Sequence, residues 1–152
     1  MTADLFNLER FVGAQEDIYG TALAEIRAGA KRSHWMWFIF PQLAALGQSA
    51  AAKRFGIEAI EEAQAYLEHP VLGSRLRECV AALQALPPAK AERIFGPIDA
   101  LKLRSSLTLF DAAGGGPQFA EALQRWFGGG DPKTVALLRR PSEFAKSPKP
   151  PK

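Results

Sequence analysis

The segment from residue 31 to residue 42 gathers the side chains best suited to chemistry. Two cations, Lys31 and Arg32, stand directly before Ser33, His34 and a run of aromatic residues. Lysine supplies a positive charge, histidine can exchange a proton near neutral pH, and tryptophan offers a flat apolar surface. Together these residue types are typical of a site for a ligand with an anionic group at one end and a ring at the other.

Each of these side chains has an expected role. We expect Ser33 to cap a short helix that begins at His34. Free backbone N–H groups at a helix N-terminus attract anions, so Lys31 and Ser33 are predicted to bind the anionic group. Trp35 or Trp37 is predicted to stack on the ring.

The same segment also fits the protein core. Residues 35–40 are continuously apolar, and burial in the core is expected for Met36, Phe38 and Ile39. His34 remains open between a structural hydrogen bond and a functional role. Gln42 follows the apolar run and is predicted to contact the ligand, because a buried amide needs hydrogen-bond partners.

A second polar set follows on the predicted helix over residues 97–112. Asp99, Lys102 and Ser106 are spaced by three and four residues, which places them along one stripe of a helix. The structural interpretation is an ion pair between Asp99 and Lys102, with Ser106 bonded to its own helix. The functional interpretation is that the stripe lines a pocket opposite Ser33 and His34.

The functional interpretation assigns catalytic roles to two residues. His34 or Asp99 would act as general acid or base, and Lys102 would neutralise developing charge. Hydrolysis or glycosidic cleavage of a nucleotide-like metabolite is the reaction class expected. We expect no metal and no cofactor, because two histidines and one cysteine, widely spread, match no zinc spacing.

The elements that must position these residues are helices. Apolar residues recur at helical spacing, most clearly over residues 72–86, and no alternating strand pattern occurs. We predict an all-α, compact, single-domain bundle whose central buried helix covers residues 97–112. Residues 35–40 are predicted to form a buried short helix that bends at Pro41. Ser49, His69 and Asp131 are expected helix caps, and Gly29 is an expected helix end.

The predicted central helix has apolar residues on two sides. One side carries Ile98, Leu101 and Leu109, and the other carries Leu103 and Leu107. A helix that is apolar nearly all round is expected to be buried along its length.

Length and composition fit one domain. The chain has 152 residues, and residues 1–140 are predicted to form the helical domain. Residues 141–152 are rich in proline and lysine and are predicted to be a disordered basic tail. Without that tail, 16 basic and 15 acidic residues remain. No basic stripe follows a predicted helix, so we expect no nucleic-acid partner.

The compartment follows from the same observations. Cys79 is the single cysteine, so no intramolecular disulfide can form, and its register with Leu76 and Leu83 predicts an inert core thiol. No signal peptide precedes the first predicted helix, and no apolar run approaches the ~20 residues of a membrane span. Cytoplasmic residence without a membrane partner is expected. The oligomeric state is left open.

Several of these motifs resemble a known family. The resemblance lies in residues 8–15, 31–42, 69–73 and 95–110. These ranges contain the Ser33–Gln42 block, the His69–Pro70 pair and the Ser105–Phe110 run. They resemble domain-of-unknown-function family 1810, a bacterial family whose members are sometimes labelled calpastatin, a name that nothing in these residues supports. The resemblance spans roughly residues 6–139 and implies a compact all-helical domain. It implies no established activity, cofactor or catalytic residue.

Two functions therefore remain open. The first is binding or hydrolysis of a small anionic, ring-bearing metabolite in a pocket between residues 31–42 and the stripe over residues 99–106. The second is a non-catalytic protein-interaction module that uses an exposed aromatic segment and the basic tail. A pocket requires the two polar sets to face each other, whereas an interaction surface requires Trp35 and Trp37 to be broadly exposed.

Overall fold

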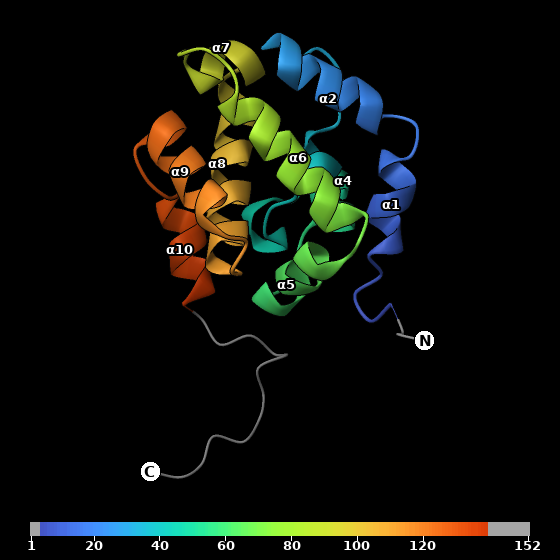
Figure 1. The fold of residues 1–152 in the computed structure, drawn as a ribbon. Helices are drawn as coiled ribbons and strands as arrows, with labels where there is room; N and C mark the ends of the chain where they lie inside the picture. Colours follow the sequence, from blue (N-terminus) through green and yellow to red (C-terminus); the bar gives the residue numbers. More distant parts are fainter. Residues whose placement is uncertain (1–3, 140–152) are drawn as a thin grey trace.

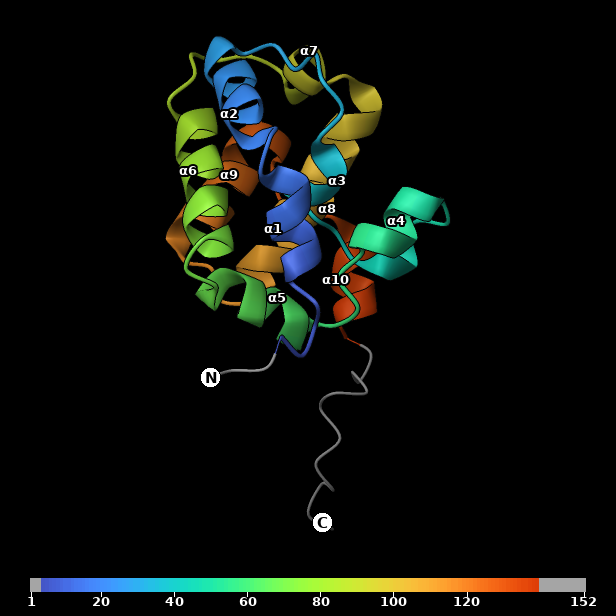
Figure 2. The same cartoon turned by 90° about the vertical axis from the view of Figure 1, so that its right-hand side faces the viewer.

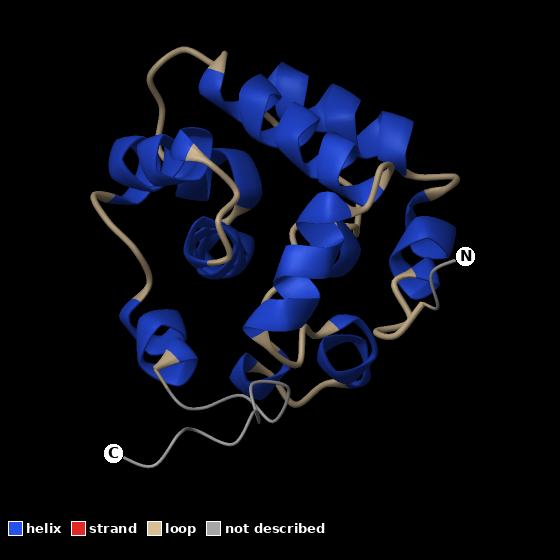
Figure 3. Cartoon of the chain, turned by 60° about the horizontal axis from the view of Figure 1, so that its bottom comes forward, coloured by secondary structure: helices blue, strands red, loops and turns tan. Residues whose placement is uncertain are grey.

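The computed structural model describes residues 4–139, which fold into helices joined by short loops (Figure 3). No strand occurs within those residues, and the one β contact is an isolated parallel bridge between Leu43 and Ile57. The all-α prediction is therefore confirmed. The predicted tail over residues 141–152 lies outside the described residues. In chain order the elements are α1 (Glu9–Gln15), α2 (Tyr19–Ala28), α3 (Met36–Ile39), the 3-10 helix η1 (Ala44–Leu46), α4 (Ala50–Phe55), α5 (Ile60–Glu68), α6 (Leu72–Gln84), α7 (Ala91–Phe95), α8 (Pro97–Ala112), α9 (Pro117–Phe127) and α10 (Pro132–Leu138).

The predicted central helix is α8. It packs against α3, α5, α7, α9 and α10, while α6 packs against α2, α5 and α9. Figure 1 shows α6 crossing in front of α8, with α9 and α10 on one side and α1 and α2 on the other. Buried side chains from these helices form one continuous core, in which Leu103, Leu107 and Phe110 of α8 are 0% exposed.

The first turn of α8 departs from its prediction. Ile98 and Leu101 were expected on a buried face, but they are 70% and 65% exposed. Leu109, further along the same face, is 0% exposed. The periodicity of a helix identifies its apolar faces, but it does not show where neighbouring helices stop covering them.

Local capping follows the sequence closely. Ser49 Oγ accepts a hydrogen bond from Ala52 N at 3.1 Å, and Asp131 Oδ2 accepts one from Thr134 N at 3.0 Å. His69 Nδ1 accepts from Val71 N and Leu72 N, both at 3.2 Å, so this histidine caps α6 as predicted. These short-range contacts could be predicted because each depends on residues two or three positions apart.

Two glycines bend the chain beside the predicted site. Gly29 ends α2 with φ 69°, and Gly96 separates α7 from α8 with φ 82°. Both angles lie in the left-handed region that only glycine adopts at low cost. The segments that meet these bends are joined by a backbone hydrogen bond from Lys31 N to Ile94 O at 2.9 Å. The loop before α3 is thereby held against the end of α7, directly before α8.

Candidate functional site: a small cationic pocket between α3 and α8

The loop over residues 31–35 is organised by one carboxylate from α2. Glu25 accepts hydrogen bonds from Arg32 N at 2.8 Å, Ser33 N at 2.9 Å and Ser33 Oγ at 2.6 Å. It also accepts one from Trp35 Nε1 at 2.9 Å. Trp35 is 0% exposed, and a buried indole N–H needs such a partner. Glu25 therefore fixes the loop and the orientation of the tryptophan.

These bonds change the pKa of Glu25. Partial burial of the carboxyl raises its pKa, but the hydrogen bonds from Ser33, the Arg32 amide and Trp35 outweigh burial and lower it from 4.5 to about 2. Donors aimed at a carboxylate stabilise its ionised form. Glu25 is thus ionised, and anchors the loop, at every pH at which proteins normally work.

Lys31 lies on the other side of this loop and points into the protein. Its side chain is 7% exposed, and its Nζ lies 2.8 Å from Asp99 Oδ2. Nζ also donates to Ser33 O at 2.6 Å and lies 4.9 Å from the ring centroid of Trp35. An ammonium group this buried is tolerated because oxygen and ring partners compensate for the water that it loses.

Asp99 and Lys102 complete the site from the first turns of α8. Lys102 Nζ lies 3.4 Å from Asp99 Oδ1, which is the predicted ion pair at a spacing of three residues. The same Nζ lies 3.9 Å from the ring centroid of Trp37. One carboxylate is therefore shared by two ammonium groups, and each ammonium also covers an indole ring.

A pocket of about 80 Å³ lies among these groups. It is lined by seven residues: Lys31, His34, Trp35, Met36, Trp37, Asp99 and Lys102. The volume compares with ~30 Å³ for one water molecule and ~300–1,000 Å³ for a pocket that encloses a drug-sized ligand. It suits a phosphate or carboxylate group and leaves the rest of any larger ligand outside. Its lining carries two ammonium groups against one carboxylate, so positive charge is in excess.

The structure brings most of the predicted site residues together. Lys31, His34, Trp35, Trp37, Asp99 and Lys102 all line this pocket, although the chain separates the two sets by more than 60 residues. α3 and α8 are in contact, and they lie side by side in Figure 2. His34 is exposed at the pocket and makes no hydrogen bond within the described residues.

Three predicted residues do not line the pocket. Ser33 directs its hydroxyl to Glu25. Gln42 lies beyond the end of α3, where its carbonyl accepts a hydrogen bond from Ile57 N at 2.9 Å. Ser106 is 0% exposed, and its Oγ has no hydrogen-bond partner. The predicted bond from Ser106 to its own helix is made instead by Ser105, to Leu101 O at 3.1 Å.

The predicted helix N-terminal anion site is also wrong. α3 begins at Met36 and has only four residues, and no side chain caps it. Ser33 cannot cap it because Glu25 holds the serine backbone and hydroxyl away from the helix. Positive charge in the pocket therefore comes from the lysine side chains.

Sequence reasoning missed Glu25 and Met36. Glu25 lies on α2, before the loop that it organises, and no local pattern distinguishes it from other helical glutamates. Met36 was assigned to the core, and it is 3% exposed while also lining the pocket. Only the three-dimensional structure identifies these two contributions.

A larger hollow of about 390 Å³ lies between the N-terminal segment, α4 and α5. Arg10 lines it, but all five guanidinium N–H groups are already used. They bond to Glu62 and to the carbonyls of four residues: Phe6, Asn7, Arg54 and Gly56. This arginine holds segments of the fold together, and the smaller pocket is the better candidate for a ligand.

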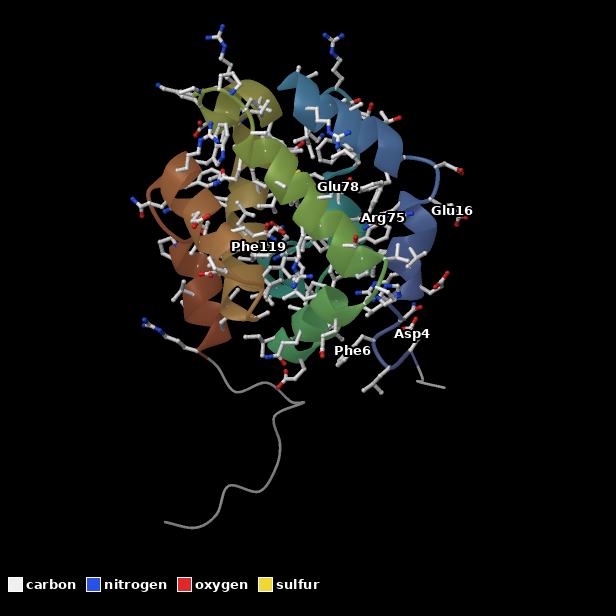
Figure 4. All side chains as sticks on the ribbon, in the orientation of Figure 1. Asp4, Phe6, Glu16, Arg75, Glu78 and Phe119 are labelled. Carbon is white, nitrogen blue, oxygen red and sulfur yellow. The ribbon has the colours of Figure 1, made fainter. Side chains whose placement is uncertain are left out.

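A third polar cluster joins α1 to α3, α5 and α6. The Gln15 amide donates to Phe38 O at 2.7 Å and to Tyr66 Oη at 3.0 Å, and its carbonyl accepts from Arg75 at 3.3 Å. Arg75 and Glu78 project from α6 toward α1 and α2 in Figure 4. Burial raises the pKa of the neighbouring Cys79 thiol to about 12, which agrees with the predicted inert core thiol. This cluster is therefore structural.

The described residues contain neither a metal-binding cluster nor a membrane-spanning helix. No three His, Cys, Asp or Glu side chains in residues 4–139 gather closely enough to hold a metal ion. Across the same residues, every helix is too short or too polar for a membrane span.

The fold and the site together define a class, a small all-helical domain with a cationic, tryptophan-walled pocket against its central helix. The chain belongs to the family described as protein of unknown function (DUF1810), whose model matches residues 5–138. It is similar to the crystal structure of the conserved hypothetical protein Rv1873 from Mycobacterium tuberculosis, with 50% sequence identity and a TM-score of 0.89. That match covers 91% of this chain and 100% of the other chain. No functionally curated protein matches.

Replacement of Glu25 by glutamine tests the anchor of the loop. We expect Glu25→Gln to lower the free energy of unfolding at pH 7 by about 1–3 kcal/mol, because an amide cannot replace a charged acceptor of four donors. The pKa of Glu25 is depressed when folded, so its contribution is complete above about pH 4.5 and is lost toward pH 2. The difference between wild type and variant, measured by urea denaturation, should therefore shrink as the pH falls through that window.

Glu16→Gln is the matched control. Glu16 is exposed and lies at the edge of the molecule in Figure 4, so its replacement should change stability by less than about 0.5 kcal/mol. Equal effects of the two substitutions, or a difference for Glu25→Gln that does not depend on pH, would contradict the assigned role.

Proposed function

We propose that the protein binds a small anionic metabolite and that its anionic group enters the pocket between Lys31 and Lys102. The observation that carries this proposal is the excess of positive charge around a space of about 80 Å³, the size of a phosphate or carboxylate group. Ammonium groups in a partly dry site bind anions more strongly than they do in open solvent. Lys102 is the more adaptable of the two, because its bond to Asp99 is the longer one.

The ring of a nucleotide-like ligand would lie outside this pocket. Trp35 lines the pocket but is 0% exposed, so it is not proposed to stack on the ring. Trp37 is half-buried, with Lys102 over its ring. Of the two tryptophans, only Trp37 retains a proposed contact with the ring of the ligand.

Hydrolysis or glycosidic cleavage is a narrower proposal at the same pocket. His34 is the better candidate for general acid or base, because it is exposed and makes no hydrogen bond within the described residues. Asp99 is bonded to two ammonium groups and would have to leave both before it accepted a proton. The positions of these side chains support ligand binding more directly than they support catalysis.

The alternative of a protein-interaction module gains less support. It requires Trp35 and Trp37 to be broadly exposed, whereas Trp35 is buried and Trp37 is half-buried beside Asp99.

We also propose that the protein acts in the bacterial cytoplasm, because its one cysteine is a buried free thiol.

Lys102→Met tests anion binding directly. The methionine keeps the apolar stem over Trp37 and removes the charge. We expect wild-type protein to bind AMP in isothermal titration calorimetry, and Lys102→Met to weaken binding by about tenfold or more, since one charge-assisted contact is lost. Lys133→Met, an exposed lysine on α10, is the control and should leave affinity unchanged. A Lys102→Met protein that binds AMP as tightly as wild type would reject the proposal.

Asp99→Asn tests whether the carboxylate competes with the ligand for the two lysines. The substitution removes the carboxylate that both lysines share, so it should destabilise the protein and also raise its affinity for anions. We expect inorganic phosphate to raise the melting temperature of Asp99→Asn by more than it raises that of wild type, because bound phosphate replaces the lost charge. A smaller phosphate shift in the variant would mean that Asp99 itself is needed for the ligand.

A further inference from the structure

Two exposed apolar side chains lie next to the pocket. Among the described residues, the large hydrophobic side chains with high exposure are Leu5, Val71, Ile98 and Leu101. Two of these four, Ile98 and Leu101, lie in the first turns of α8, which also carry Asp99 and Lys102. Single exposed apolar residues are ordinary on protein surfaces, and this pair is distinguished by its place on the helix turns that carry Asp99 and Lys102.

Helix geometry fixes how close this pair is to the charge. Ile98 precedes Lys102 by four residues, so their side chains are neighbours on one face, with Cβ atoms about 5–6 Å apart. Ile98 precedes Leu101 by three residues, so these two side chains are also neighbours on the helix surface. The chemical order across the surface is therefore carboxylate, ammonium and apolar pair.

The size of the pocket explains why this surface matters. A space of about 80 Å³ cannot enclose both an anionic group and a ring. Trp35 closes the inner wall, and the ammonium of Lys102 covers one face of Trp37. The body of a bound ligand must extend outward, and Ile98 and Leu101 are the apolar surface on that side of Lys102.

We infer that Ile98 and Leu101 bind the apolar ring of a ligand whose anionic group occupies the Lys31–Lys102 pocket. Ile98 lies one helical turn before Lys102, so a ligand whose anionic group meets the ammonium of Lys102 can lay its ring on the apolar pair. The ligand class is then a nucleoside monophosphate or a compound of the same design, in preference to a bare inorganic anion. The inference rests on the proposed function, and it adds the residues that set specificity.

The test compares three probes on two proteins. AMP carries an anion, a sugar and a ring, ribose 5-phosphate lacks the ring, and inorganic phosphate lacks both. We expect wild-type protein to bind AMP more tightly than ribose 5-phosphate in isothermal titration calorimetry. The double variant Ile98→Ser/Leu101→Ser should lose about tenfold of this preference, which is typical of losing a hydrophobic contact. Its affinity for inorganic phosphate should stay the same.

Leu5→Ser is the matched control, because Leu5 is 76% exposed and lies away from the pocket. It should leave the affinities for all three probes unchanged. A double variant that keeps the preference for AMP, or a wild type without any preference, overturns this inference and leaves anion binding intact. Absence of binding for all three probes removes the proposed function together with the inference.

Analytical ultracentrifugation tests whether a second copy of the chain covers this surface instead of a ligand. Wild type and double variant should sediment as the same species at equal concentration. A larger species in wild type that dissociates in the double variant would make Ile98 and Leu101 an interface between copies, which also overturns the inference.

Discussion

The ion pair between Lys31 and Asp99 is the constraint on which the candidate site depends. It joins a loop to the central helix α8, with Nζ and Oδ2 2.8 Å apart and the lysine side chain 7% exposed. Removing Asp99 would leave the largely buried charge of Lys31 without its counter-charge, which makes the spacing of the two segments costly to change. The pair ties the loop before α3 to the first turn of α8, and the pocket lies between these segments.

The loop is held by acids on both of its sides. Glu25 of α2 binds the amides, the hydroxyl and the indole N–H of residues 32–35, and Asp99 of α8 binds Lys31. Glu25 turns toward the backbone and does not line the pocket, so it adds rigidity without cancelling the charge of the lysines. A preorganised arrangement of this kind reduces the free-energy cost of ordering the site when a ligand binds. The same arrangement also explains why Lys102, with its longer bond to Asp99, is the side chain best able to adjust.

The sequence predicted what depends on neighbours in the chain. The stripe of Asp99 and Lys102, the caps at Ser49 and His69 and the short buried helix after residue 35 all depend on spacings of a few residues. It did not predict what depends on distant neighbours. Glu25 accepts a hydrogen bond from the hydroxyl of Ser33, and the helices around α8 leave Ile98 exposed. Neither feature can be recognised from residues that are near in the sequence. From residue types alone, we hypothesised that the two polar sets lie close together. The contact between α3 and α8 brings them together in the structure.

The central claim, that an anionic ligand binds between α3 and α8, can be tested most directly by NMR. The chain has three tryptophans, and their indole N–H groups report from two places. Trp35 and Trp37 line the pocket, whereas Trp126 on α9 donates to Gln84 of α6 at 2.8 Å. In a titration of ¹⁵N-labelled protein with AMP, the indole signals of Trp35 and Trp37 should move together in a saturable way while that of Trp126 stays fixed. Movement of Trp126 alone, or no saturable movement of any indole signal, would contradict the account.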